Sequence, residues 1–299
     1  RCEDHDRVPT PNDEAPLLHI LPPWGSIYVP MPEPALLESA VRRTGAPLCV
    51  GIDPVRDRLP AGDDLQVIQD FGLRIVDQLA DLVPAVKIQS ACYERFGPDG
   101  IAVRDQLALH AREAGLIVVL DAKRGDIGVS SEHYAASAFS RPSAPADWVT
   151  ISPYLGADGM QPFLEQGAAF ALVRTSNPGG TALQTLPLQD GRTVAHAVAD
   201  IVRELGETFL DTESQWSRLG AVVGATHAAE IAELRARMPK QWFLMPGVGA
   251  QGGSAADVAE AFVDGMGVLV NASRSIIYAE DPVAAAQELI QSLREVASL

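Results

Sequence analysis

Cysteine and histidine are scarce in this sequence of 299 residues, and neither forms a binding pattern. The three cysteines, Cys2, Cys49 and Cys92, include no C-x-x-C pair, which excludes a disulfide-stapled secreted domain. None of the six histidines stands in an H-x-x-x-H or H-E-x-x-H motif, so we expect no zinc site. No apolar run approaches the roughly 20 residues that a membrane-spanning helix needs. We therefore expect a cytoplasmic protein with free thiols and no membrane partner.

Positive charge is also in short supply, because 23 lysines and arginines stand against 39 aspartates and glutamates, a net charge of −16. Such a surface repels nucleic acid and anionic lipid, so a bound anion requires a local basic site. Hydrophobic residues at 47% and charged residues at 21% are ordinary for a globular chain, which excludes a disordered or coiled-coil protein.

Residues 1–34 differ from the rest of the chain in their content of proline. Eight prolines fall in this stretch, and proline blocks regular backbone hydrogen bonding. We expect an irregular extension over 1–34, followed by one domain over 35–299, where no linker or break in composition appears.

Short apolar segments alternate with longer amphipathic stretches throughout 35–299. Continuous apolar strands indicate burial on both faces, as in a parallel sheet covered by helices. Eight β-α units in about 250 residues are typical of a TIM barrel, and a doubly wound open sheet is the alternative. The predicted strands are 48–52, 85–89, 116–121, 148–152, 170–174, 221–225, 242–245 and 268–271. Predicted helices include 65–82, 101–114, 193–205, 228–237 and 255–263.

Charged residues collect at the carboxyl ends of these strands, where a TIM barrel carries its active site. Asp53 follows the first strand, Lys87 interrupts the second, and Asp121, Lys123 and Asp126 come at and after the end of the third. An unpaired buried charge is costly, so a lysine inside an apolar strand must reach a counter-ion or a ligand.

The spacing of these charges predicts an alternating cluster. Asp121 and Lys123 are two residues apart, so on extended backbone their side chains point to the same side. Gly125 permits a sharp turn that directs Asp126 elsewhere. Lys87, Asp121, Lys123 and Asp126 together supply two cations and two anions, and in alternation each keeps its neighbours ionised. A purely structural ion network at the barrel mouth is the alternative.

The segment 245–253, M-P-G-V-G-A-Q-G-G, satisfies the dinucleotide pattern G-x-G-x-x-G. That motif belongs to the first turn of a Rossmann unit, however, and here only one strand follows. TIM barrels often bind phosphate after strands 7 and 8, where glycines let backbone N–H groups approach the anion. Arg274, just beyond the last strand, supplies a fork for phosphate oxygens. We therefore favour a monophosphate ligand over a dinucleotide.

Motifs spread over residues 48–279 resemble those of the orotidine 5′-phosphate decarboxylases, and most of all the longer bacterial subtype. The string D-A-K-R-G-D-I-G (121–128) is highly specific, whereas the glycine-rich string alone would be weak. The other matching segments are L-C-V-G-I-D-P, K-I-Q-S-A-C-Y-E, D-W-V-T-I-S-P-Y-L-G-A-D, R-T-S-N-P-G-G, V-V-G-A-T, P-G-V-G-A-Q-G-G and N-A-S-R-S-I-I-Y-A.

The resemblance implies an enzyme that converts orotidine 5′-phosphate to UMP and CO₂ with no cofactor and no metal. It implies that Asp53 binds a ribose hydroxyl and that Lys87 bridges the ribose and the catalytic aspartate. Asp121 would lie against the substrate carboxylate, and Lys123 would protonate C6 of the pyrimidine.

Further substrate contacts also follow from the resemblance. Ser176 would bind the amide edge of the pyrimidine, and Gln251, Gly252 and Arg274 would hold the phosphate. Ser130, which stands where the family usually has threonine, would lie near the pyrimidine.

The resemblance implies a homodimer as well. Asp126 and Ile127 of each subunit would reach into the active site of the partner.

Three rival functions remain open on the sequence. A metal-dependent sugar-phosphate decarboxylase or aldolase of the same barrel superfamily also has D-x-K-x-x-D, but it carries an acidic metal ligand near the position of Lys87. An inactive phosphate-binding protein and a dinucleotide-linked reductase are the others.

Overall fold

The computed structural model describes residues 34–140, 146–249 and 252–298. The predicted extension over 1–34 therefore lies outside the described residues, apart from Pro34. This proline is the first residue of helix α1 (Pro34–Thr44), which agrees with its tolerance of the first turn of a helix.

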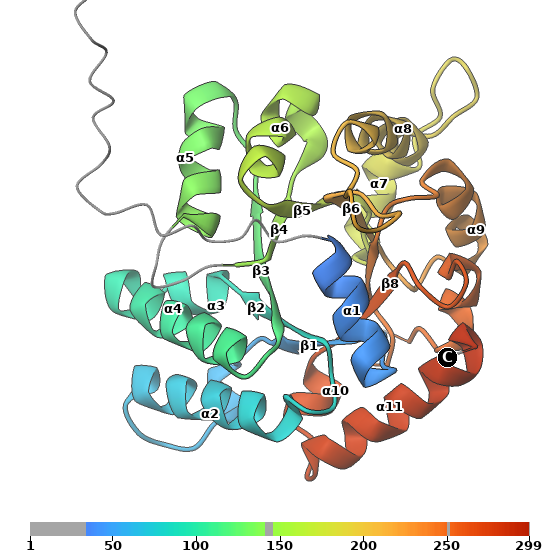
Figure 1. The fold of residues 1–299 in the computed structure, drawn as a ribbon. Helices are drawn as coiled ribbons and strands as arrows, with labels where there is room; N and C mark the ends of the chain where they lie inside the picture. Colours follow the sequence, from blue (N-terminus) through green and yellow to red (C-terminus); the bar gives the residue numbers. More distant parts are fainter. Residues whose placement is uncertain (1–33, 141–145, 250–251, 299) are drawn as a thin grey trace, which may run out of the picture. The chain divides into compact units, whose positions relative to one another are not determined.

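Eight parallel strands close into a barrel in the order of the sequence, with β1 hydrogen-bonded to β8 (Figure 1). The predicted TIM barrel is confirmed, and the doubly wound open sheet is excluded. The strands are β1 (Leu48–Ile52), β2 (Ala85–Gln89), β3 (Ile117–Arg124), β4 (Trp148–Ile151), β5 (Ala168–Arg174), β6 (Leu219–Val223), β7 (Phe243–Pro246) and β8 (Val268–Ala272).

Helices surround the strands and bury their outer faces (Figure 1). They are α2 (Asp64–Leu79), α3 (Ala91–Glu94), α4 (Gly97–Glu113), α5 (Gly128–Phe139), α6 (Ala157–Gln166), α7 (Thr181–Gln184), α8 (Val194–Glu207), α9 (Ala228–Arg237), α10 (Arg274–Ile277) and α11 (Pro282–Ala297). Short 3₁₀ turns are η1 (Arg56–Arg58), η2 (Pro153–Leu155), η3 (Pro178–Gly180) and η4 (Ala256–Ala261). None of the helices in the described ranges is long and apolar enough to cross a bilayer.

One predicted helix is wrong. The stretch 255–263 forms the 3₁₀ turn η4 and not an α-helix. It lies between the glycine-rich segment and β8, and extended backbone at Phe262 ends it after six residues. Connections between longer elements often take 3₁₀ geometry.

Large side chains fill the amino-terminal end of the barrel. Trp148 and Phe170 stack inside it with ring centroids 4.4 Å apart. Leu37 and Val41 of α1 belong to the same buried cluster, together with Trp216. The barrel is therefore a packed core at this end, and only its carboxyl-terminal end is available for a binding site.

Candidate active site

A pocket of about 560 Å³ lies at the carboxyl ends of the strands. Five of the predicted site residues line it: Asp53, Lys87, Asp121, Lys123 and Ser176. They come from β2, β3 and the segments after β1 and β5, which are far apart in the sequence. The barrel topology brings them together because all its strands end at the same rim.

Four of the charged side chains form a chain of ion pairs. Lys87 Nζ lies 3.0 Å from Asp53 Oδ1 and 3.0 Å from Asp121 Oδ2. Lys123 Nζ lies 2.6 Å from Asp121 Oδ1. The predicted alternation of charge is present, but its order is Asp53, Lys87, Asp121, Lys123.

Asp126 does not join this cluster within its own chain, and its predicted place in the partner's site stays a prediction. Its Oδ1 accepts a hydrogen bond from Ile127 N at 2.9 Å, and it makes no ion pair with any residue that the structure describes. Neither Asp126, Ile127 nor Ser130 is among the residues that line the pocket. Asp126 and Ile127 lie on the turn from β3 into α5, and Ser130 lies in the first turn of α5; 57% of Ile127 is exposed. The turn at Gly125 therefore directs Asp126 away from its own site.

The ion pairs hold both central groups in their charged forms. Burial alone would raise the pKa of Asp121, but the ammonium groups of Lys87 and Lys123 outweigh it and keep this pKa well below its ordinary value. Burial would likewise lower the pKa of Lys87, but the carboxylates of Asp53 and Asp121 raise it above its ordinary value. The site thus carries fixed charges at neutral pH.

Lys123 does not have the extended backbone that its spacing from Asp121 suggested. Its φ is +47°, in the left-handed region, and the pairing of β3 with β4 shifts register between Leu120 and Arg124. The two side chains still meet, but they do so across a bulge. β-bulges are common next to active sites, where they re-aim a side chain.

Two neutral partners of Asp121 were not predicted from the sequence. Gln89 Nε2 donates to Asp121 Oδ2 at 3.0 Å, and Thr150 Oγ1 donates to Asp121 Oδ1 at 2.8 Å. Each has a signal in the sequence. Gln89 stands two residues after Lys87 and so shares its side of β2, and Thr150 interrupts the apolar run W-V-T-I.

A second missed cluster holds the segment that carries Ser176. The Arg174 side chain is 2% exposed, and its Nε donates to Glu230 Oε2 at 2.8 Å. Gln184 Oε1 accepts hydrogen bonds from Arg174 Nη1 at 3.2 Å and from Thr175 N at 3.0 Å. These contacts tie the end of β5 to α7 and α9 and so place Ser176 on the pocket wall.

Arg274 lies beside the main pocket. It lines a hollow of about 90 Å³ that shares Asp53, Pro246 and Asn271 with the larger pocket. Gly247 also lines the hollow and has a φ of +115°, which only glycine adopts readily. The glycine-rich segment follows β7 of a barrel and not the first strand of a Rossmann unit, so the basis for a dinucleotide site is absent. Gln251 lies outside the described residues, and its predicted role stays a prediction.

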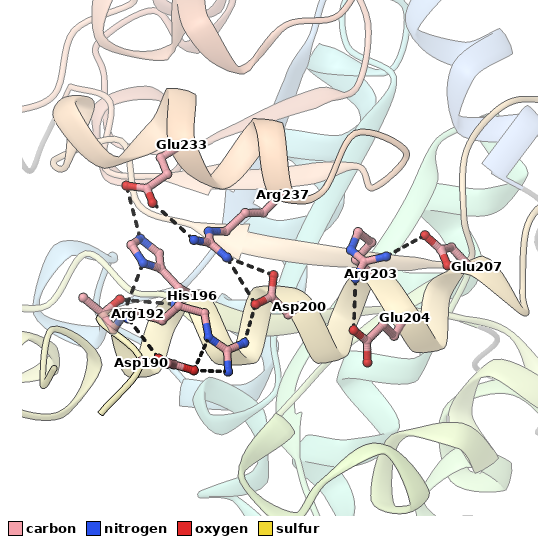
Figure 2. A network of polar contacts seen from close by, with 10 residues as sticks. Asp190, Arg192, His196, Asp200, Arg203, Glu204, Glu207, Glu233 and Arg237 are labelled. Carbon is pink, nitrogen blue, oxygen red and sulfur yellow. Dashed lines mark hydrogen bonds and ion pairs between the residues drawn. The ribbon is translucent and has the colours of Figure 1, made fainter. Parts of the chain in front are cut away.

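A further charged network lies on the outer helices α8 and α9 and on the residues just before α8 (Figure 2). Arg192 Nη1 lies 2.6 Å from Asp200 Oδ2, Arg237 Nη1 lies 3.1 Å from Asp200 Oδ1, and His196 Nε2 lies 3.4 Å from Glu233. None of these residues lines the pocket. The network joins two neighbouring helices and is separate from the site.

A closed parallel barrel with a charged pocket at the carboxyl ends of its strands defines an enzyme of the TIM-barrel class. Comparison with known proteins gives the family. A sequence model of the orotidine 5′-phosphate decarboxylase / HUMPS family matches residues 46–289. The chain therefore belongs to this family.

Several relatives are similar over most of their length. The orotidine 5′-phosphate decarboxylase of Rhodopirellula baltica is 42% identical over 266 residues, which cover 81% of this chain and 87% of the relative. That of Roseiflexus castenholzii is 40% identical over 268 residues, covering 87% and 94%. The solved structure of Leishmania donovani OMP decarboxylase is 34% identical with a TM-score of 0.75, covering 89% of this chain and 98% of that one.

Proposed function

We propose that this chain decarboxylates orotidine 5′-phosphate to UMP and CO₂ in pyrimidine biosynthesis, with no cofactor and with Lys123 as the proton donor. The bond between C6 and the carboxylate breaks, CO₂ leaves, and its electron pair stays on C6. A proton from Lys123 Nζ then forms the C6–H bond, and the neutral amine regains a proton from solvent. The observation that carries the proposal is the Asp121–Lys123 pair inside the pocket, with 2.6 Å between carboxylate and ammonium.

The chemistry requires electrostatic stabilisation. The electron pair left on C6 occupies an sp² orbital that the pyrimidine ring delocalises poorly. A fixed ammonium group placed where negative charge develops lowers the barrier. The side chain of Lys123 lines the pocket, is 49% exposed and is paired with Asp121, which meets this need.

Asp121 contributes in a second way. It stays ionised, so a substrate carboxylate beside it experiences like-charge repulsion that is relieved when CO₂ leaves. We rank this contribution below the stabilisation by Lys123.

The rest of the pocket positions the nucleotide. In this proposal Asp53 binds a ribose hydroxyl, Lys87 bridges the ribose and Asp121, and Ser176 contacts the pyrimidine. Arg274 holds the phosphate, together with Gly252 and the predicted Gln251. Binding of this remote group closes a loop over the site and excludes water, so it raises the rate and does not merely tighten binding.

The proposal includes a homodimer in which Asp126 and Ile127 complete the partner's site. Large apolar side chains near Asp126 support it, because Tyr154 is 81% exposed and Val129 is 63% exposed. Val129 lies in α5 and Tyr154 in η2, directly before α6, and these helices are adjacent, since Ser131 Oγ lies 2.7 Å from Asp126 O and 3.0 Å from Gly159 O of α6. Exposed apolar surface of this kind marks an interaction site.

Mixing inactive variants tests the shared site. Asp126→Ala and Lys123→Ala proteins, each inactive, should regain activity when mixed, because one of the two sites in a hybrid dimer is intact. No recovery after confirmed subunit exchange argues against the shared site.

A cytoplasmic location belongs to the same proposal. Cys49 is buried and Cys92 is half-buried, and both are free thiols. Burial raises the pKa of the Cys49 thiol to about 12, so this cysteine stays protonated and unreactive.

Lys123→Ala tests the mechanism. Turnover, followed as the loss of orotidylate ultraviolet absorbance without added metal, should disappear. Binding of a 6-substituted UMP analogue should persist, because the other pocket residues remain. Lys240→Ala is a matched control, since Lys240 is exposed and does not line the pocket. Turnover retained by Lys123→Ala overturns the mechanism.

A further inference from the structure

We infer that Thr150 is a positioning residue for the proton transfer, because its hydroxyl fixes the backbone of Lys123 and the carboxylate of Asp121 relative to each other. The inference rests on the proposed function of Lys123 as proton donor. It concerns geometry and not charge, since the threonine hydroxyl is neutral throughout.

The hydrogen bonds of Thr150 have only one possible direction. Thr150 lies in β4 and is 1% exposed. Its Oγ1 accepts a hydrogen bond from Lys123 N at 3.0 Å and donates one to Asp121 Oδ1 at 2.8 Å. An amide N–H can only donate and a carboxylate can only accept, so the hydroxyl must act as acceptor toward the first and donor toward the second.

Lys123 has a particular need for such support. It is one of three non-glycine residues with positive φ in the part of the chain that the structure describes. A side chain disfavours this left-handed conformation, which persists only where the surroundings hold it. Strand β4 and the residue directly after it do so at two points. Thr150 binds the Lys123 amide, and Ser152 N donates to Arg124 O at 2.7 Å.

Arg124 is itself restrained on the other side of the bulge. Its guanidinium pairs with Glu94 of α3 and lies 5.4 Å from the ring centroid of Tyr134. The bulge is therefore fixed on both flanks, and the hydroxyl of Thr150 is the contact that joins it to the catalytic carboxylate.

Thr150 and Lys123 act on the same oxygen of Asp121. Oδ1 accepts from Thr150 Oγ1 and Lys123 Nζ, and Oδ2 accepts from Lys87 Nζ and Gln89 Nε2. The carboxylate is thus held at both ends. Without the hydroxyl, Oδ1 of Asp121 keeps only its contact with Lys123 Nζ, and the Lys123 amide loses its hydrogen-bond acceptor.

The test compares Thr150→Val with Thr150→Ser. Valine keeps the branched shape and suits a buried strand, but it has no hydroxyl. We expect kcat to fall about 10–100-fold in Thr150→Val, because small displacements of catalytic groups have effects of this size. The Kd for UMP should stay within about 2-fold, since the binding residues are untouched. Thr150→Ser restores the hydroxyl and should recover most of kcat. If Thr150→Val does not fold, Thr150→Ala serves as the second variant without a hydroxyl.

Two results overturn the inference. The first is a kcat for Thr150→Val equal to that of the wild type. The second is that the hydroxyl-free variants lose affinity for UMP and have a lower Tm, and that Thr150→Ser does not recover either property. The proposed function fails separately, by turnover in Lys123→Ala, whatever the Thr150 variants show.

Discussion

Lys87 Nζ lies 3.0 Å from Asp121 Oδ2, and less than a tenth of either side chain is exposed. The same ammonium lies 3.0 Å from Asp53 Oδ1. One buried cation therefore separates two carboxylates that would otherwise repel each other. Removing one partner of a buried ion pair leaves an uncompensated charge, which is far more costly than losing a surface salt bridge.

Lys87→Met should therefore destabilise the fold as well as abolish turnover. We expect the free energy of unfolding to fall by about 3–5 kcal/mol, the range found when one member of a buried pair is removed. Urea denaturation measures this change, with Lys240→Met as the exposed control. An unfolding free energy equal to that of the wild type would show that the two carboxylates do not need the ammonium between them.

Asp121 should make stability dependent on acid pH. Its pKa in the folded protein lies below the ordinary value of 3.8, so unfolding takes up a proton as the pH falls between the two values. The stabilisation is complete above about pH 4 and is lost progressively below it. Asp121→Asn lacks this titration. The unfolding free energy of the wild type should therefore fall relative to that of Asp121→Asn as the pH falls below about 4.

Urea titrations of both proteins from neutral pH to about pH 3 test the sign, because this range extends below the ordinary pKa of 3.8, where the unfolded protein takes up the proton and the folded protein does not. The wild type should lose stability more steeply than Asp121→Asn on acidification. Parallel curves for the two proteins would contradict the lowered pKa.

The barrel is largely predictable because its strands are buried on both faces. Burial forces a continuous apolar run, and the predicted 48–52 and 85–89 coincide with β1 and β2. The predicted strand 221–225 is displaced by two residues from β6 (Leu219–Val223). It ends too late because the apolar run A-V-V-G-A continues past the last residue that pairs with β5. The pattern of apolar residues indicates which residues are buried, but it does not indicate where the hydrogen bonds between neighbouring strands end.

The site is predictable where strand position decides it. Asp53, Lys87, Asp121 and Lys123 meet because each stands in or directly after a strand that ends at the same rim of the barrel. Two features depend on backbone geometry that the sequence does not encode locally. The left-handed φ of Lys123 occurs at a residue other than glycine, and the shift of register between β3 and β4 beside it leaves no mark in the residue pattern.

Activity should not depend on a divalent metal. Asp53 and Asp121 could supply oxygen ligands, but the ammonium of Lys87 lies between them and would repel a dication. Within 34–140, 146–249 and 252–298, no group of three or more His, Cys, Asp or Glu side chains is placed to hold a metal ion. Turnover measured in excess EDTA should equal turnover with added Mg²⁺. Reversible loss in EDTA, restored by Mg²⁺, would favour the metal-dependent enzymes of the barrel superfamily.

Arg274 should contribute to catalysis only when the substrate carries a phosphate. It is exposed, it lines the hollow beside the main pocket, and it forms no ion pair with another described residue, so its guanidinium is available to an anion. A charged hydrogen bond contributes about 1.5–3 kcal/mol, so Arg274→Ala should lower kcat/KM for orotidine 5′-phosphate about 10–100-fold. The much slower turnover of orotidine, which lacks the phosphate, should be unchanged. Arg203→Ala, on the outer helix α8 (Figure 2), is the matched control for loss of an arginine. An equal loss with both substrates would show that Arg274 supports the fold of the site and does not bind the phosphate.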